Sequence, residues 1–466
     1  MDDSQFKVII VGGSIAGLSL AHCLYKAGIT CIILEKRSEI AAYEGASVAI
    51  MPNGGRILEQ LGLYEAVERL IEPMHVAHVR FPDGFHFSSP YPKVMHEAFG
   101  FPMAFISRQK LLQILYHSFP EKSRIYVDKT VNRIEYQNQN SVLVHTQDGR
   151  SYRGDLVVGA DGVHSCVRTQ MWHIADTLRP GMIPNDEKKG MTVSYACIFG
   201  ISSEVPELKI GHLHLSVHNG KSFIIAPGIN GRQSWFVVLK LDKTYPYRSA
   251  PRFSPKDAAS LCEQLTEKYV WGNIQFAQLW QRQEIYSMAP LEENIFRTWH
   301  FGRIVCIGDS MHKMTPNLAQ GANCSIEDAA SLANTIYDAL NTKDHQHKLS
   351  DQEVNHHLCL FNKLQIDRMT KIYKGSRMVV RLQTRDNLFW RLILRYHVPY
   401  AGNEPTEKAL KILEGAIALS FIPLPQRSGP RWVLPRKTEK RLFAWAGATL
   451  VFLLVGLIWW PLESIS

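Results

Sequence analysis

The chain lacks the features that mark secreted and metal-binding proteins. Its eight cysteines stand singly and form no CxxC pair, so we expect reduced, buried thiols rather than disulfides or a zinc site. Residues 1–5 are acidic and polar and have neither the basic nor the apolar region of a signal peptide. We also find no internal repeat and no metal-ligand motif. These absences favour a cytosolic body and predict no bound metal.

Basic charge is concentrated in one segment. The formal net charge is +9, yet residues 427–441 alone carry six basic residues against one Glu. A nucleic-acid-binding face would need basic residues spread among aromatic ones. We therefore expect no nucleic-acid partner, and the location of the charge favours the edge of a membrane.

The segment 442–462 contains no charged residue over 21 positions. As a helix it would be ~31 Å long, enough to cross a bilayer core. Tryptophans lie near both ends, and four basic residues within 436–441 precede it. We predict a single-pass C-terminal transmembrane helix, in the endoplasmic reticulum, with the body in the cytosol. A buried core helix is the alternative.

At 466 residues the chain is long enough for at least two domains. Residues 6–34 show the strand, helix, strand pattern of a βαβ unit. Between 191 and 242, alternating strands are joined by Asn219-Gly220 and Asn230-Gly231, which are hairpin dipeptides. The predicted fold is α/β: a Rossmann-like domain with an inserted antiparallel sheet, followed by C-terminal helices and the transmembrane helix. Residues 423–435 are proline-rich and predict a tether, whereas 415–424 could lie at a surface or pack on the body.

A glycine-rich loop follows the first predicted strand and opens a helix, the context in which backbone N–H groups meet a dinucleotide pyrophosphate. Its glycines are Gly12, Gly13 and Gly17. Ser14 replaces the middle glycine of the G-x-G-x-x-G pattern and makes the loop more crowded. Glu35 ends the second strand 18 residues after Gly17, where a carboxylate accepts hydrogen bonds from an adenosine ribose. An ordinary glycine turn is the alternative.

The run 305–323 has the composition of a second wall of the same pocket. A short buried strand, 303–307, ends at Gly308-Asp309, where a carboxylate could meet ribityl hydroxyls. Residues 316–321 form a loop, and a helical pattern follows from Asn323, so the loop offers N–H groups and a positive helix end.

Three further positions are candidates from local pattern. Arg108 follows a predicted N-cap, Ser107, at a helix start, where a cation is unfavourable unless an anion lies nearby; it contacts a cofactor or is a solvated surface residue. Strand alternation places Tyr195 on an apolar face, as a proton-handling or orienting group or as ordinary core. His214 and His218 share one strand face but have no third ligand for a metal.

Together these segments resemble the single-component, FAD-dependent, aromatic-hydroxylase-type monooxygenases, over about residues 6–340. The phrases 11–18, 34–37, 52–54 and 308–313 are similar to the fungal branch that epoxidises prenyl chains in indole-diterpene and meroterpenoid pathways. Ala49 and Ala319 stand where that family often has glycine, which implies a looser approach of the backbone to the flavin.

The resemblance implies the cofactor contacts. It places Glu35 at the adenosine ribose, Arg108 at the flavin and Asp309 near the pyrophosphate and ribityl chain. Ala49 belongs to the loop 45–53, and Gly321 and Ala322 lie near the ring. Because only one nucleotide loop is present, NADPH is expected to dock transiently, reduce the FAD and leave, after which O2 forms a C4a-hydroperoxyflavin.

The resemblance also implies a discontinuous domain organisation. The FAD-binding domain is expected to comprise 1–75, 101–178 and 283–385, and the substrate domain 76–100 and 179–282. A helical, proline-rich basic linker, 386–441, would lead to the transmembrane helix.

The leading hypothesis is a membrane-anchored epoxidase of the terminal alkene of a farnesylated or geranylgeranylated, lipophilic intermediate. A ring hydroxylase of an aromatic acid is the first alternative, and a carboxylate-binding arginine in the cavity would favour it. A non-catalytic flavin-binding membrane protein is the second.

Overall fold

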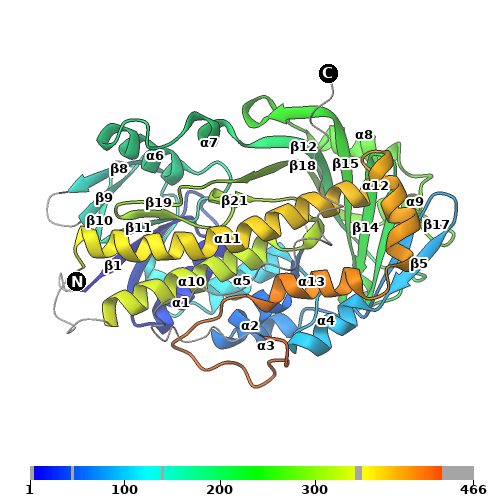
Figure 1. Ribbon diagram of the computed structural model, residues 1–466, viewed down its shortest axis with the longest axis horizontal. Helices are drawn as coiled ribbons and strands as arrows, with labels where there is room; N and C mark the ends of the chain where they lie inside the picture. Colours follow the sequence, from blue (N-terminus) through cyan, green and yellow to red (C-terminus); the bar gives the residue numbers. More distant parts are fainter. Residues whose placement is uncertain (1–4, 43–46, 138–140, 342–348, 433–466) are drawn as a thin grey trace, which may run out of the picture. The chain divides into compact units, whose positions relative to one another are not determined.

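The computed structural model describes residues 5–42, 47–137, 141–341 and 349–432. Two large sheets dominate these residues, and the helices α10 and α11 lie side by side against them (Figure 1). The helices are α1 (Ile15–Lys26), α2 (Pro52–Gln60), α3 (Tyr64–Glu68), α4 (Tyr91–Phe99), α5 (Arg108–His117), α6 (Cys166–Leu178), α7 (Asn185–Lys189), α8 (Pro255–Glu263), α9 (Phe276–Trp280), α10 (Gly321–Asn341), α11 (Asp351–Gln383), α12 (Leu388–Leu392) and α13 (Glu404–Glu414).

The first sheet is the predicted nucleotide-binding sheet. Its strands, in spatial order, are β19 (His300–Phe301), β20 (Ile304–Cys306), β11 (Leu156–Gly159), β1 (Lys7–Val11), β2 (Thr30–Leu34) and β7 (Ile125–Tyr126). All neighbours are parallel except β19 and β20. The central strands are buried on both faces, as the continuous apolar runs of a parallel sheet require. The predicted βαβ opening is confirmed.

The second sheet contains the region predicted to be an inserted antiparallel layer. Its strands, in order, are β21 (His312–Lys313), β18 (Gln283–Ile295), β12 (Thr192–Ser202), β15 (Gln233–Pro246), β14 (Lys221–Pro227), β13 (His212–His218), β4 (Val76–Arg80) and β5 (His86–Ser89). Asn219-Gly220 joins β13 to β14, and Asn230 and Gly231 both have positive φ in the turn before β15. The predicted turns are therefore confirmed, although β4 pairs in parallel with β13.

Three smaller sheets complete the described strands. A two-stranded ribbon, β3 (Ser47–Ile50) with β6 (Ala104–Ser107), carries Ala49 opposite Phe105. The other two are β8 (Val131–Gln137), β9 (Ser141–Thr146) and β10 (Ser151–Gly154), and the pair β16 (Tyr269–Trp271) and β17 (Ile274–Gln275).

Helix α11 spans 33 residues and begins at a capping box made by Ser350 and Glu353. Its buried side chains recur at helical spacing, so one face packs along the body: Val354, Leu358, Phe361, Gln365, Met369, Ile372, Ser376 and Val380.

The residues after α13 pack on the body and are not a free tether up to Trp432. Trp432 is 8% exposed, with the Arg56 guanidinium 3.7 Å from its ring centroid. Arg427 pairs with Glu59 and Glu68. The prolines of this stretch do not prevent its side chains from docking. The prediction of a tether is therefore wrong for 423–432, and 415–424 lies on the body, with Leu419 2% exposed.

The prediction that all cysteines are buried needs correction, and the predicted transmembrane helix lies outside the described residues. Cys359 is exposed and Cys166 half-buried, while the other cysteines are buried and all eight are free. The predicted transmembrane helix, 442–462, falls outside the described residues. Within 5–432, and leaving aside the gaps, no helix combines the length and the apolar character that crossing a bilayer requires. The division into discontinuous domains stays a prediction.

Candidate functional site

The loop after β1 is shaped by its glycines. Gly12 has φ of +108°, and a Cβ there would lie 2.4 Å from the carbonyl oxygen of Ala160. A Cβ on Gly17 would lie 1.9 Å from the carbonyl oxygen of Gly12, so only glycine lets α1 pack this closely on the loop. Glu35 is 8% exposed and its Oε2 accepts from the Gly13 N–H at 2.6 Å. The predicted loop and carboxylate therefore adjoin.

Ser14, the departure from the glycine pattern, links two predicted site residues. Its Oγ accepts from Nη2 of Arg108 at 2.9 Å, which brings the start of α5 to the nucleotide loop. Ser14 is also the N-cap residue of α1 but makes no side-chain capping bond. The first N–H groups of α1 are thus left for another acceptor, as a pyrophosphate-binding helix needs. Ser107 similarly precedes α5 without the predicted capping bond.

The turn after β20 presents Asp309. Gly308–Ser310 form a single 3-10 turn, and Oδ2 of Asp309 accepts from Nζ of Lys313 at 2.5 Å. Burial alone would lower the pKa of Lys313, but the Asp309 carboxylate more than offsets this and leaves the pKa raised. Lys313 therefore stays charged. Lys313 was not predicted as a site residue, although its position four residues after Asp309 could have indicated the ion pair.

Ala319 precedes α10 in a left-handed backbone conformation, with φ of 56°. The resemblance implied that an alanine here would leave the flavin approached more loosely, which stays a prediction; the left-handed conformation adds backbone strain at this L-residue. Two residues later, α10 begins at Gly321, and a Cβ placed on Gly321 would meet nothing within 4 Å. The start of this long helix therefore faces open space.

Asn323 joins the two walls of the site. Its Oδ1 accepts from the Met51 N–H at 2.9 Å, and its Nδ2 donates to the carbonyl oxygens of Ala49 (2.9 Å) and Ala319 (2.7 Å). A Cβ on Gly54 would lie 2.2 Å from the same Oδ1, which explains a glycine there. Asn323 thus fixes the strand that carries Ala49 against the loop before Ala322. The sequence placed Asn323 at the helix start but gave no sign of these partners.

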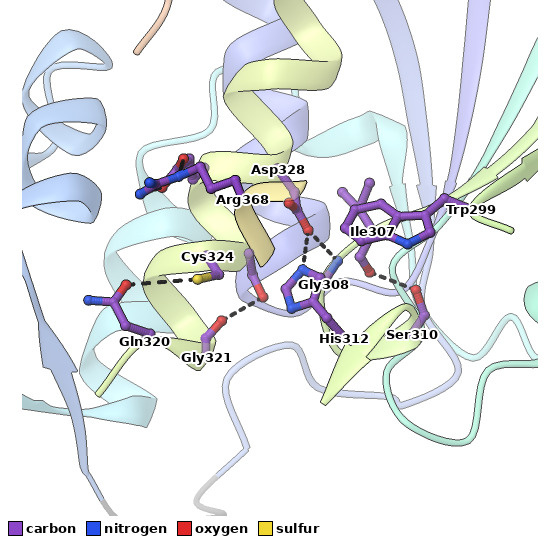
Figure 2. A network of polar contacts seen from close by, with 12 residues as sticks. Trp299, Ile307, Gly308, Ser310, His312, Gln320, Gly321, Cys324, Asp328 and Arg368 are labelled. Atoms are coloured by element: carbon purple, nitrogen blue, oxygen red, sulfur yellow. Dashed lines mark hydrogen bonds and ion pairs between the residues drawn. The ribbon is translucent and has the colours of Figure 1, made fainter. Parts of the chain in front are cut away.

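A buried His–Asp pair supports the Asp309 turn from behind. Oδ2 of Asp328 lies 2.6 Å from Nε2 of His312 and accepts from the Gly308 N–H at 2.8 Å, and both side chains are fully buried. Figure 2 shows His312 and the backbone of Gly308 directed at the same carboxylate oxygen, with Trp299 beside the imidazole. Burial would lower the pKa of His312, but Asp328 raises it overall.

Arg168 holds the other side of the turn. Its guanidinium donates to the carbonyl oxygens of Ser310 (2.5 Å) and Val163 (2.9 Å). Asp161, by contrast, accepts from the N–H groups of Cys166 and Val167 at the start of α6, next to the N-cap residue Ser165.

Tyr195 lies on the second sheet, within an apolar cluster that includes Cys197, Phe236 and Val380. A register shift between Val193 and Tyr195 breaks the predicted alternation there, and Val193 does not belong to the cluster. Phe105, which pairs with Ala49, packs on this cluster too. The ribbon β3–β6 therefore connects Tyr195 with the site.

The hydroxyl of Tyr195 has polar neighbours at the end of α11. Burial, together with Asp386, raises the pKa of Tyr195, so its hydroxyl stays protonated; Thr384 lies beside it. The guanidinium of Arg381 stands 5.6 Å from its ring centroid. Whether Tyr195 is catalytic stays a prediction.

His214 and His218 do share the predicted strand face, but they belong to a different region. His214 stacks on His78, its ring centroid lies 5.0 Å from that of Trp271, and burial lowers its pKa to about 3. Burial lowers the pKa of His218 to about 4. Among the described residues, no three His, Cys, Asp or Glu side chains are grouped as a metal ion would require.

These contacts fit FAD. The glycine loop and Glu35 could hold the adenosine and pyrophosphate, and Asp309 the ribityl chain. That Arg108, Ala49, Gly321 and Ala322 would contact the ring stays a prediction from the resemblance. When bound, FAD supplies the redox and oxygen chemistry, whereas the protein supplies the cradle.

Comparison with known proteins agrees. A family model described as an FAD binding domain matches residues 5–354. The chain is 50% identical over 460 residues to the FAD-dependent monooxygenase olcE of Penicillium canescens, covering 98% of this chain and 99% of the relative. It is also 50% identical over 456 residues to the FAD-dependent monooxygenase spyC of Aspergillus fumigatus, covering 97% and 96%.

A solved structure shows the same fold. Klebsiella pneumoniae HpxO, complexed with FAD and uric acid, superposes with a TM-score of 0.68 at 22% identity, covering 88% of this chain and 97% of that one. The chain therefore belongs to the FAD-binding monooxygenase family and is an FAD-dependent monooxygenase that uses NADPH as co-substrate.

Proposed function

We propose that this monooxygenase epoxidises the terminal alkene of a prenylated, lipophilic terpenoid or meroterpenoid intermediate of a fungal secondary-metabolite pathway. One oxygen atom of O2 enters the alkene as the epoxide and the other leaves as water, while NADPH and a proton supply the two electrons and the hydrogen. The oxygen chemistry belongs to the flavin. The protein must exclude water and hold the alkene close to the ring.

The observation that carries this proposal is a methionine-rich apolar cluster beside Ala319. Four buried methionines belong to it: Met51, Met74, Met95 and Met103. Ala319 and Phe105 pack on the same cluster, and Phe105 and Ile224 also pack on the cluster that contains Tyr195. Methionine side chains are flexible and polarisable, so they repack around irregular apolar ligands. We take this cluster as the surface against which a prenyl chain packs.

The charges near Tyr195 argue against an aromatic acid as substrate. Arg377 and Arg381 lie 3.6 and 3.7 Å from Oε1 of Glu293, whose side chain is 1% exposed. Both arginines are therefore already paired with a carboxylate of the chain itself. Burial raises the pKa of Glu293 despite both cations.

For Tyr195 we propose an orienting role. Its raised pKa excludes a base at neutral pH, and the position of Asp386 and Thr384 beside the hydroxyl fixes the ring. Tyr195→Phe is expected to change the ratio of product formed to NADPH consumed rather than the rate of flavin reduction. An unchanged ratio would rule this role out.

We further propose that residues 442–462 anchor the chain in the endoplasmic reticulum with the body in the cytosol, so that the enzyme meets membrane-dissolved substrate. Support comes from the sequence alone: 21 uncharged residues after a basic run. Arg427 and Arg431 contribute less to that run than their charge suggests, since both form ion pairs within the body. Extraction of membranes at alkaline pH should leave the chain in the pellet; release would contradict the anchor.

The reaction is tested by incubating the full chain, loaded with FAD, with a farnesylated or geranylgeranylated acceptor, NADPH and 18O2. We expect a product heavier by one labelled oxygen that hydrolyses to a diol. The matched control is the same acceptor with its terminal alkene hydrogenated, which should remain unchanged. Turnover of an aromatic acid together with an untouched prenyl alkene would overturn the proposal.

A further inference from the structure

A helical stretch after α11 exposes large apolar side chains. Helix α12 continues as a π-helical turn, Ile393–His397, and a 3-10 turn, Val398–Tyr400; we call residues 388–400 the outer helix. Its exposed apolar residues are Leu388 (68% exposed), Phe389 (58%), Leu392 (49%), Tyr396 (65%) and Tyr400 (73%). Four of these recur at every fourth position.

The opposite face of the outer helix is firmly packed. Leu394 is buried against Phe81 and Val217, and Val398 packs on the same cluster. The guanidinium of Arg395 stands 3.6 Å from the ring centroid of Phe85. The exposed side chains thus belong to a helix that packs on the body, and fraying does not explain their exposure.

The start of the outer helix is stabilised by a capping residue. The side chain of Asn387 accepts from the Trp390 N–H at 3.1 Å and caps α12. Figure 1 shows the stretch at the edge of the second sheet, beside β5. A capped, packed helix with an apolar outer face is an interaction surface, because soluble proteins seldom expose contiguous apolar patches without a partner.

Charge identifies the kind of partner. The outer helix itself carries two arginines and no acidic residue: Arg391, and Arg395, which also pairs with Asp83 at 3.4 Å. Arginines beside exposed Leu, Phe and Tyr are typical of helices that lie in the headgroup region of anionic bilayers. A second copy of the chain would instead bring like charges together, which is unfavourable.

We propose that the outer helix binds an anionic bilayer in the plane of the membrane, inserting Leu388, Phe389 and Leu392 among the acyl chains. This contact is separate from the anchor proposed for 442–462 and would fix how the body is oriented on the surface. The inference rests on the proposed membrane location but not on which bond is oxidised.

The test uses the full, FAD-loaded chain on phosphatidylcholine vesicles with and without phosphatidylserine, doped with a photoactivatable phospholipid. After illumination and trypsin, lipid adducts are quantified on three peptides. Residues 396–408 report the outer helix, 442–466 the proposed anchor, and 169–188 a control surface that exposes Leu178 (62%) and Met182 (39%). On anionic vesicles we expect 396–408 to be labelled at least about five-fold more than 169–188, and less on neutral vesicles.

A triple variant, Leu388→Gln, Phe389→Gln and Leu392→Gln, keeps good helix formers at these positions. It should lower labelling of the unchanged peptide 396–408 to the control level while 442–466 stays labelled. Leu178→Gln is the matched control and should change neither. Thermal unfolding of each variant checks that it is folded.

Two outcomes would overturn the inference. One is labelling of 396–408 at the level of 169–188 while 442–466 is labelled. The other is a dimer that the triple variant dissociates, which would make a second copy the partner. If only the proposed anchor is wrong, the peptide 442–466 stays unlabelled. If only the epoxidation proposal is wrong, the labelling of all three peptides remains as expected.

Discussion

At Ala319 an L-residue adopts the left-handed conformation that glycine adopts without strain. Replacing it should relieve about 1–2 kcal/mol of strain, partly offset by the larger unfolded-state entropy of glycine. We expect Ala319→Gly to raise the free energy of unfolding by about 0.5–1 kcal/mol, measured by urea denaturation.

Ala322→Gly is the matched control, because Ala322 lies three residues away within α10. Glycine there should lower stability, by up to about 1 kcal/mol. If both substitutions shift stability in the same direction, the strain assigned to Ala319 is wrong.

Glu35 provides a second prediction at the scale of one residue. Its two carboxylate oxygens accept from the N–H groups of Gly13 (2.6 Å) and Arg37 (3.0 Å). An amide in its place turns one acceptor into a donor, which costs about 1.5–3 kcal/mol for a charge-assisted contact. We expect Glu35→Gln to weaken FAD binding by about ten- to a hundred-fold, measured from the recovery of free-flavin fluorescence.

Glu39→Gln controls for the change of charge, since Glu39 is exposed a few residues later in the same connection. It should bind FAD as the unmodified protein does. Equal FAD affinity in both variants would remove Glu35 from the cofactor site.

At the scale of the elements, α10 carries two asparagines whose side chains both form hydrogen bonds to backbone groups, but in different parts of the protein. Asn323 joins β3 to the flavin loop. Asn334 bonds to Ala418 and Ser420 on the docked C-terminal segment. Each alanine variant should lose about 1–3 kcal/mol of stability. Only Asn323→Ala is expected to lower FAD affinity, measured at a temperature where both variants are folded. Equal affinities would contradict its role as a clamp.

The His312–Asp328 pair between β21 and α10 predicts a pH dependence with a definite sign. The pKa of His312 in the folded state lies above its ordinary value of 6.5. Its contribution to stability is therefore full below pH 6.5 and is lost as pH rises through the folded pKa. The difference in stability between the unmodified protein and His312→Gln should shrink over that window, as followed by thermal unfolding.

His300 is the control of opposite sign, because burial lowers its pKa to about 4. Its contribution is present above pH 6.5 and is lost as pH falls toward 4. Differences that run the same way for both histidines would contradict the assignment of the His312–Asp328 pair.

Whether an element or a contact could be predicted from the sequence depends on how far apart along the chain its interacting residues lie. The strand, turn and helix around Gly12 to Gly17, and the hairpins at Asn219 and Asn230, depend on neighbouring residues and were predicted. The bonds of Asn323 to Ala49, and of Arg168 to Ser310, join residues more than a hundred positions apart. Local periodicity contains no information on such partners. The docked stretch 423–432 was misjudged as a tether for the same reason.

At the scale of the whole molecule, the reactivity of the cysteine thiols measures whether the protein unfolds cooperatively. Cys359 is exposed, whereas Cys23, Cys31, Cys197, Cys262, Cys306 and Cys324 are buried. Burial also raises the pKa of Cys31 and Cys262 to about 12, which suppresses the reactive thiolate. We expect a thiol reagent to modify Cys359 rapidly and the six buried thiols only at the rate of global opening. Rapid modification of Cys306 in the folded protein would contradict the tightly packed nucleotide-binding sheet.

The strand order of the first sheet also has a consequence for biosynthesis. β1 lies between β2 and β11, and β11 in turn pairs with β20, whose residues 304–306 come about three hundred positions after β1. The turn at Asp309 and the start of α10 follow directly on β20. A ribosome must therefore release more than two thirds of the chain before both walls of the flavin site exist, and such non-local pairing folds slowly. Flavin can join the protein only late in synthesis, so the nascent chain must stay soluble without it until then.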